Sequence, residues 1–271
     1  MSTFEGKVVL ITGAARGMGR SHCLHYAGLG ADVIALDACA GLATVPYAAA
    51  SEEDLEATAD AVRGLGRNVV ARKVDVRDQS AMTTAVSSGV DELGRLDIAV
   101  ANAAIAPLMI DPTDPEQVWR DVIDVNLTGA YNTAQAAAPS IIAGGVGGNI
   151  VFINSTAGLK GSLAMGTVGG YAYTASKHGL VGLTRAFAID LAPHSIRVNT
   201  LHLSGVATPM VVNESMERLK AQRDMSAWTN LLPGGRMAAE DVSSVLAWIT
   251  SDEARHLTGV SLPVDSGFSI K

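Results

Sequence analysis

The chain has 271 residues, of which 48% are hydrophobic, and its 20 Lys and Arg against 27 Asp and Glu give a formal net charge of −7. The apolar fraction excludes an intrinsically disordered chain, and the acidic balance argues against a nucleic-acid partner or an anionic membrane surface. The two cysteines, Cys23 and Cys39, are too few for a disulfide scaffold and lack metal-ligand spacing, so no metal site is expected. No apolar signal region follows Met1, and we expect a cytoplasmic protein.

Short apolar runs alternate with helical patterns along the chain. β-rich runs suggest strands, and helical spacing lies between nearly all of them. Apolar strands that alternate with helices predict a parallel sheet covered on both faces. No repeat or linker divides the sequence, so residues 1–271 are predicted to form one doubly wound α/β domain with a seven-stranded parallel sheet. The expected strands are 8–11, 31–36, 68–74, 96–101, 149–153, 196–201 and 260–264.

Residues 125–159 contain no charged side chain. Pro139 and the glycines after it are expected to break this stretch into pieces shorter than the ~20 residues of a membrane-spanning helix. We therefore predict a helix over 125–143 that is buried on both faces, followed by a loop and a core strand. Left exposed, such a helix would form a large apolar patch, so a second subunit is expected to cover it.

A glycine-rich turn follows the first strand and opens a helix. Gly13, Gly17 and Gly19 allow a tight turn and a close approach of the backbone to a pyrophosphate at the helix N-terminus. Arg16 and Met18 lie in the same turn. A glycine cluster alone often marks an ordinary turn, but the strand–turn–helix context predicts a dinucleotide site.

Asp37 ends the second strand, where a carboxylate can accept hydrogen bonds from the adenosine ribose and repel a 2′-phosphate. This position predicts NAD over NADP. Arg16 is a contrary signal, because an arginine beside the turn could pair with that phosphate or could simply be a solvated charge.

Polar residues also follow the third and fourth strands. Asp75 and Val76 come after the third strand, and Asn102 and Ala103 come after the fourth. At the carboxyl edge of the sheet they are expected to border the adenine ring and its ribose. Taken singly, each position is more typical of a turn than of a binding site.

Tyr173 and Lys177 are spaced so that a helix places both on one face. A nearby ammonium stabilises a phenolate and is expected to lower the pKa of Tyr173 from about 10 towards neutrality, which suits proton exchange with a substrate hydroxyl. A half-exposed surface pair is the simpler alternative. Ser155 after the fifth strand and Asn126 in the uncharged helix favour the catalytic interpretation.

Together these motifs resemble the short-chain dehydrogenase/reductase family, and the resemblance extends to Gly259 and the segment 265–267. It implies a Rossmann-type fold and a homotetramer. More narrowly, residues 14–17, 174–179 and 192–199 are similar to the mycofactocin-coupled, carveol-dehydrogenase-like branch. The motifs that carry the family resemblance are Thr12-Gly13-x-x-x-Gly17-x-Gly19, Asn102-Ala103-Ala104, Asn126, Ser155 and Tyr173-x-x-x-Lys177.

The resemblance implies a role for each catalytic residue. Tyr173 would be the general acid and base, and Lys177 would tune it and bind the nicotinamide ribose. Ser155 would hold the substrate oxygen, and Asn126 would orient a water in the proton relay. Two residues after the sixth strand, Val206 and Thr208, are expected cofactor contacts.

Two segments are expected to close the site. An uncharged insertion at 38–51 begins where the adenosine should lie, and we expect it to fold over the cofactor and slow its release. A Met-rich lid over 203–236, with Met210, Met216 and Met225, predicts a small hydrophobic alcohol or ketone as substrate.

The leading hypothesis is an NAD-dependent oxidoreductase for a hydrophobic secondary alcohol and its ketone, with tightly held NAD reoxidised by mycofactocin. One alternative is an ordinary short-chain carbonyl reductase that exchanges NAD(P) freely. A non-catalytic dinucleotide sensor would have little reason to keep the four catalytic residue types together. A sugar-nucleotide epimerase would need a larger C-terminal lobe.

Overall fold

One parallel sheet forms the centre of the computed structural model, which describes residues 4–108, 112–161, 166–222 and 228–271. The sheet has seven strands in the order β3-β2-β1-β4-β5-β6-β7, and all neighbouring pairs are parallel. This arrangement confirms the predicted doubly wound, Rossmann-type fold. The strands are β1 Val8–Thr12, β2 Asp32–Asp37, β3 Val69–Lys73, β4 Ile98–Ala101, β5 Gly148–Ser155, β6 Ile196–Leu203 and β7 Ser261–Val264.

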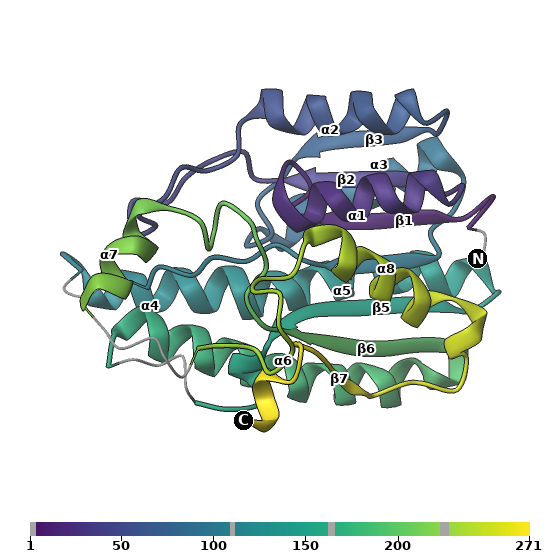
Figure 1. Ribbon diagram of the computed structural model, residues 1–271. Helices are drawn as coiled ribbons and strands as arrows, with labels where there is room; N and C mark the ends of the chain where they lie inside the picture. Colours follow the sequence, from purple (N-terminus) through teal and green to yellow (C-terminus); the bar gives the residue numbers. More distant parts are fainter. Residues whose placement is uncertain (1–3, 109–111, 162–165, 223–227) are drawn as a thin grey trace.

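Helices cover both faces of the sheet (Figure 1). On one face α1 packs against α2 and α8, and on the other α5 packs against α3 and α6, with α4 also against α6. The helices are α1 Gly17–Gly28, α2 Glu52–Gly64, α3 Gln79–Leu93, α4 Pro115–Ile123, a π-helical turn η1 Asp124–Thr128, α5 Gly129–Gly144, α6 Val168–Leu191, α7 Glu214–Gln222 and α8 Ala239–Thr250.

Alternation along the strands divides the apolar core into two layers. In β1, Val8 and Leu10 join the layer under α3, α5 and α6, whereas Val9 and Ile11 join the layer under α1 and α8. Successive side chains of a strand point to opposite faces, so a stretch of strand that is covered on both faces must be apolar at successive positions. The near-continuous apolar runs in the sequence have this physical cause.

The strand order reverses at β1, which lies between β2 and β4. At such a switch point the loops after the two neighbouring strands diverge to opposite faces and leave a crevice beyond the carboxyl ends of the strands. The polar residues singled out from the sequence follow these strand ends.

Two features of the uncharged stretch differ from the prediction. Pro139 does not interrupt the helix but lies inside α5, in an exposed position where water can satisfy the carbonyl that loses its N–H partner. The helix is also not buried on both faces, because Tyr131 is 36% exposed. Farther along, β5 reaches Ser155 and β6 reaches Leu203, so Ser155 ends its strand rather than following it.

No helix in the described part of the chain is long and apolar enough to cross a membrane. The same residues contain no group of three or more His, Cys, Asp or Glu side chains placed to hold a metal ion.

Candidate active site

A cavity at the carboxyl ends of β1, β2 and β4 is bordered by the glycine-rich turn. Because this turn predicts a dinucleotide site, we call it the dinucleotide cavity. Gly13, Arg16, Gly17, Met18 and Gly19 all line it. Gly13 and Gly17 have φ values of +67° and +56°, which L side chains rarely adopt, and a Cβ on Gly19 would lie 1.9 Å from the carbonyl oxygen of Gly13. The turn therefore requires glycine, and it brings backbone rather than side chains to the cavity.

Asp37 lines this cavity from the end of β2, as the sequence predicts. Its Oδ2 accepts a hydrogen bond from the Ala15 N–H, and its Oδ1 accepts one from the Cys39 N–H, both at 3.0 Å. The carboxylate thus stabilises the glycine-rich turn and the start of the insertion, and each oxygen keeps a further lone pair for a ligand.

Arg16 lies at the same cavity, but its guanidinium donates a hydrogen bond to the carbonyl oxygen of Ala48 in the insertion. This contact assigns the arginine a role as an anchor for the insertion. Neither of the alternatives drawn from sequence, a phosphate ligand or a free solvated charge, anticipates it.

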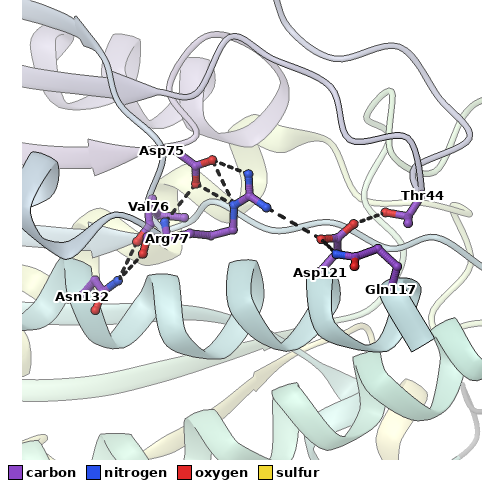
Figure 2. Close-up of polar contacts among 7 residues, drawn as sticks. All are labelled: Thr44, Asp75, Val76, Arg77, Gln117, Asp121 and Asn132. Atoms are coloured by element: carbon purple, nitrogen blue, oxygen red, sulfur yellow. Dashed lines mark hydrogen bonds and ion pairs between the residues drawn. The ribbon is translucent and has the colours of Figure 1, made fainter. Parts of the chain in front are cut away.

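The residues after β3 and β4 form the opposite wall. Asp75, Val76, Asn102 and Ala103 all line the cavity. The Asp75 carboxylate accepts from the Arg77 guanidinium at 2.6 to 3.1 Å, and the Val76 carbonyl accepts from Asn132 of α5 at 2.9 Å (Figure 2). These contacts fix the wall, and of the two donors Arg77 lines the cavity whereas Asn132 does not.

Asn102 ties the two central strands together. Its Nδ2 donates to the Thr12 carbonyl oxygen at 2.9 Å, and its backbone N–H donates to the Thr12 hydroxyl at 3.1 Å. Its Oδ1 is buried and has no hydrogen-bond partner within the described chain. A buried acceptor left unpaired in a cavity wall is a position at which a polar ligand gains free energy.

The two expected contacts after β6 differ. Thr208 lines the dinucleotide cavity. Its Cγ2 lies 3.5 Å from the position that a Cβ atom would occupy if Gly17 carried a side chain. Val206 is buried, pairs with Met237 in an isolated bridge, and lines neither this cavity nor the second cavity described below.

A second cavity adjoins the first, and Tyr173 and Ser155 both line it. The Ser155 hydroxyl oxygen accepts from the Ala157 N–H at 3.1 Å, and interaction with the Ser155 side chain acts to lower the pKa of Tyr173. Tyr171, two residues earlier on α6, is 54% exposed and lines neither of the two cavities. The structure therefore brings Tyr173, and not Tyr171, to the serine.

Lys177 lies one helical turn beyond Tyr173, is 3% exposed, and places its Nζ 5.5 Å from the centre of the tyrosine ring. The ammonium donates to the Ile153 carbonyl oxygen at 3.0 Å. Burial lowers the pKa of Lys177 to about 8 and raises the pKa of Tyr173 to about 12, although the Ser155 side chain acts to lower the latter. The expected fall of the Tyr173 pKa is therefore wrong, because burial has the largest effect on this phenol.

Asn126 lies in η1, between α4 and α5, and is 1% exposed. Its Oδ1 accepts from the Ile105 N–H at 2.8 Å and its Nδ2 donates to the Ile105 carbonyl oxygen at 2.9 Å. The side chain clamps the loop after β4, so its amide is already engaged with protein groups. A role of Asn126 in orienting a water molecule stays a prediction. The contacts themselves show that Asn126 holds the loop after β4 in place.

The insertion covers the dinucleotide cavity. Residues 38–51 contain no helix or strand, yet Ala38, Leu42, Val45 and Ala50 are among those that line the cavity. From the same segment, the Tyr47 hydroxyl oxygen accepts from the Ala106 N–H at 2.9 Å.

Two residues at the site escaped the sequence analysis. Burial, as the largest cause, raises the pKa of Tyr47 to about 12, and the proximity of Tyr173 adds to this rise. His202 of β6 is fully buried and bonds through Nδ1 to the Ser155 carbonyl oxygen at 2.9 Å. Tyr47 could have been noticed as the only aromatic residue in the insertion, whereas a histidine inside a strand offered no signal.

Apolar residues dominate the second cavity, which has a volume of about 450 Å³. The predicted lid contributes Met210, Val211, Met216 and Trp228, and Leu108, which belongs to the same apolar cluster as Met216, also lines it. Val212 is instead 55% exposed, and Met225 lies outside the described residues. An apolar cavity beside the Tyr173 and Ser155 hydroxyls suits a hydrophobic molecule that carries one oxygen.

The comparisons with known proteins agree with this geometry. The sequence profile of short chain dehydrogenases matches residues 7–219. The chain is 49% identical to an uncharacterized oxidoreductase of Mycobacterium tuberculosis, over 97% of this chain and 96% of the relative. It is 43% identical to (-)-trans-carveol dehydrogenase of Rhodococcus erythropolis over the full length of both. A crystal structure of carveol dehydrogenase from Mycobacterium avium in complex with NAD superposes with a TM-score of 0.92 at 42% identity and complete coverage of both chains.

This chain therefore belongs to the short-chain dehydrogenase family, and the family resemblance seen in the sequence is confirmed. Within that family it is similar to carveol dehydrogenases and to mycobacterial oxidoreductases.

Proposed function

We propose that this protein is an NAD-dependent dehydrogenase that interconverts a hydrophobic secondary alcohol and its ketone. The observation that carries the proposal is that Tyr173 and Ser155 line the same apolar cavity, with the buried Lys177 one turn away on α6. The carveol dehydrogenase relatives support the substrate class. Reduced nicotinamide absorbance with a panel of hydrophobic alcohols tests it.

The dinucleotide cavity fits NAD. The glycine-rich turn leaves space that a Cβ would fill, Asn102 offers an unpaired buried acceptor, and Asp37 lies where a ribose hydroxyl would bind. Bound NAD supplies the hydride acceptor for alcohol oxidation. Gly13, Gly17, Asp37, Asn102 and Thr208 would hold it, and two related mycobacterial proteins have been crystallised with NAD.

The chain's own residues handle the proton. Ser155 donates a hydrogen bond to the substrate oxygen and orients it towards Tyr173. In the oxidation, the hydrogen of the carbinol C–H bond leaves with its electron pair as hydride, and the C=O bond forms. The phenolate oxygen of Tyr173 takes the proton of the substrate hydroxyl, and in the reverse reaction it returns this proton. The Lys177 ammonium stabilises that phenolate, which burial alone disfavours.

The cofactor preference follows from the charge of Asp37. We expect wild-type protein to bind NAD at least about tenfold more tightly than NADP, because the carboxylate repels a 2′-phosphate. Asp37→Ala should flatten or reverse this preference in equilibrium titrations with both dinucleotides. Arg16→Gln is the matched control and should leave the preference intact. Comparable wild-type affinities would refute the argument, and a loss of NADP binding alone in Arg16→Gln would make Arg16 a phosphate ligand.

A tightly held cofactor is part of the proposal. The 38–51 segment lines the dinucleotide cavity and is tied down by the Arg16–Ala48 and Tyr47–Ala106 hydrogen bonds, so a bound dinucleotide leaves only after the segment moves. The hydride would then leave through a second redox carrier, mycofactocin, instead of as free NADH. The ordinary exchanging carbonyl reductase is the second candidate, and rapid release of NADH would favour it.

We also propose a cytoplasmic homotetramer with no nucleic-acid or membrane partner. Large apolar side chains are exposed on the packed helices α4, α5 and α6, where Trp119, Tyr131 and Ile189 are 42%, 36% and 74% exposed. Burying them against further copies would remove this surface from water. Light scattering at micromolar concentration should give a mass about four times the 27.9 kDa of one chain, and a monomer mass would contradict the proposal.

A further inference from the structure

We propose that Asp121, buried in α4, fastens the 38–51 segment over the dinucleotide cavity through Thr44, and so slows release of the dinucleotide. This inference rests on the proposed function, because it concerns how the same cofactor is retained. Asp121 is a positioning residue, and neither it nor Thr44 lines the cavity.

The contact itself is deeply buried. Asp121 is 4% exposed and Thr44 is 8% exposed, although the neighbours of Thr44 in the segment, Ala43 and Pro46, are exposed. The Thr44 hydroxyl donates to Asp121 Oδ2 at 2.5 Å, while Gln117 Nε2 donates to Oδ1 at 2.8 Å (Figure 2). A hydrogen bond to a buried carboxylate is stronger than one between neutral exposed groups.

Thr44 transmits this attachment to the cavity wall. Its flanking residues Leu42 and Val45 line the cavity, and the Val45 N–H donates to the Leu42 carbonyl oxygen at 3.0 Å to close a tight turn around Thr44. The threonine in this turn is thus held by α4, while Leu42 and Val45 line the cavity. Opening the segment would leave the buried Asp121 without one of its donors, which carries a free-energy cost.

Asp121 also reaches the opposite wall. Its Oδ1 lies 3.7 Å from Nη1 of Arg77, whose guanidinium holds Asp75 (Figure 2). Asp75, Val76 and Arg77 line the cavity. One carboxylate therefore connects the insertion with the loop after β3, and residues of both segments line the cavity.

The test compares two substitutions at Thr44. Thr44→Val keeps the shape but removes the donor, whereas Thr44→Ser keeps the donor. The dissociation rate of bound NADH, followed by nicotinamide fluorescence after mixing with excess NAD, should rise about tenfold or more in Thr44→Val. Thr44→Ser should stay within about twofold of wild type. Hydrogen exchange of residues 38–51 in the protein without added dinucleotide should rise in Thr44→Val and not in Thr44→Ser.

The outcomes separate the two proposals. Rapid NADH release by the wild-type protein would contradict the proposed retention of the cofactor. If Thr44→Val nevertheless released NADH tenfold faster than Thr44→Ser, the attachment of the segment by Asp121 would still be supported. Equal release rates for Thr44→Val and Thr44→Ser overturn the attachment, even when the wild type retains its cofactor. Should valine prevent folding, Thr44→Ala against Thr44→Ser gives the same comparison, with the same expected and overturning results.

Discussion

Tyr173→Phe is expected to lower turnover with a hydrophobic secondary alcohol by about 10²- to 10⁴-fold, because the variant removes the group that exchanges the substrate proton. The phenylalanine ring preserves the apolar body of the side chain on α6. NAD binding and the thermal unfolding midpoint should therefore change little. Steady-state or single-turnover kinetics, with a parallel dinucleotide titration, measure both expectations.

Tyr171→Phe is the matched control, since this tyrosine is 54% exposed on the same helix. It should retain nearly full activity. If Tyr171→Phe were the inactive variant and Tyr173→Phe the active one, the assignment of the proton-exchanging residue would be contradicted.

Shortening the insertion between Gly41 and Ala50 should release the cofactor. Purified wild-type protein is expected to carry NAD and to turn over poorly with added NAD alone, whereas an artificial electron acceptor restores activity. The shortened variant loses the Tyr47 and Ala48 contacts and the residues that line the cavity, and a connection of about 2–6 residues suffices between a strand and a helix. Its rate of NADH release, followed by fluorescence, should rise by more than about tenfold.

The shortened variant should also sustain turnover with added NAD. A shortening elsewhere on the surface, at the exposed glycines 144 and 145 at the C-terminal end of α5, is a suitable control and should leave the cofactor bound. Rapid steady-state production of free NADH by the intact protein would contradict the retention of NAD.

The sheet and the edge at which the site lies could be predicted because both depend on local sequence. Strands such as Val8–Thr12 are buried on both faces, so they are apolar throughout and stand out in the sequence. Polar residues that follow such strands must then gather at one edge, as Asp37 and Asn102 do. The helix over 125–143 could be predicted, but its continuity through Pro139 could not, since packing against α3 and α6 stabilises it despite the proline.

The finer chemistry of the site depends on tertiary burial, which spacing along the chain does not reveal. The Tyr173–Lys177 spacing predicts proximity, but the extent to which each group is buried sets the direction of both pKa shifts. The contacts of Arg16 with Ala48 and of Thr44 with Asp121 join an aperiodic segment to distant elements. No periodicity in the sequence indicates where such a segment will lie.

The most direct test of the central claim is the spectrum of the purified protein after one turnover. Stopped-flow absorbance is recorded when wild-type protein, loaded with NAD, is mixed with hydrophobic secondary alcohols, carveol among them. We expect the absorbance of reduced nicotinamide to appear with a stoichiometry of about one per chain, and to be absent in Tyr173→Phe on the same timescale. Failure of every alcohol in the panel to reduce the nicotinamide, with the dinucleotide demonstrably bound, would contradict the dehydrogenase activity proposed for this protein.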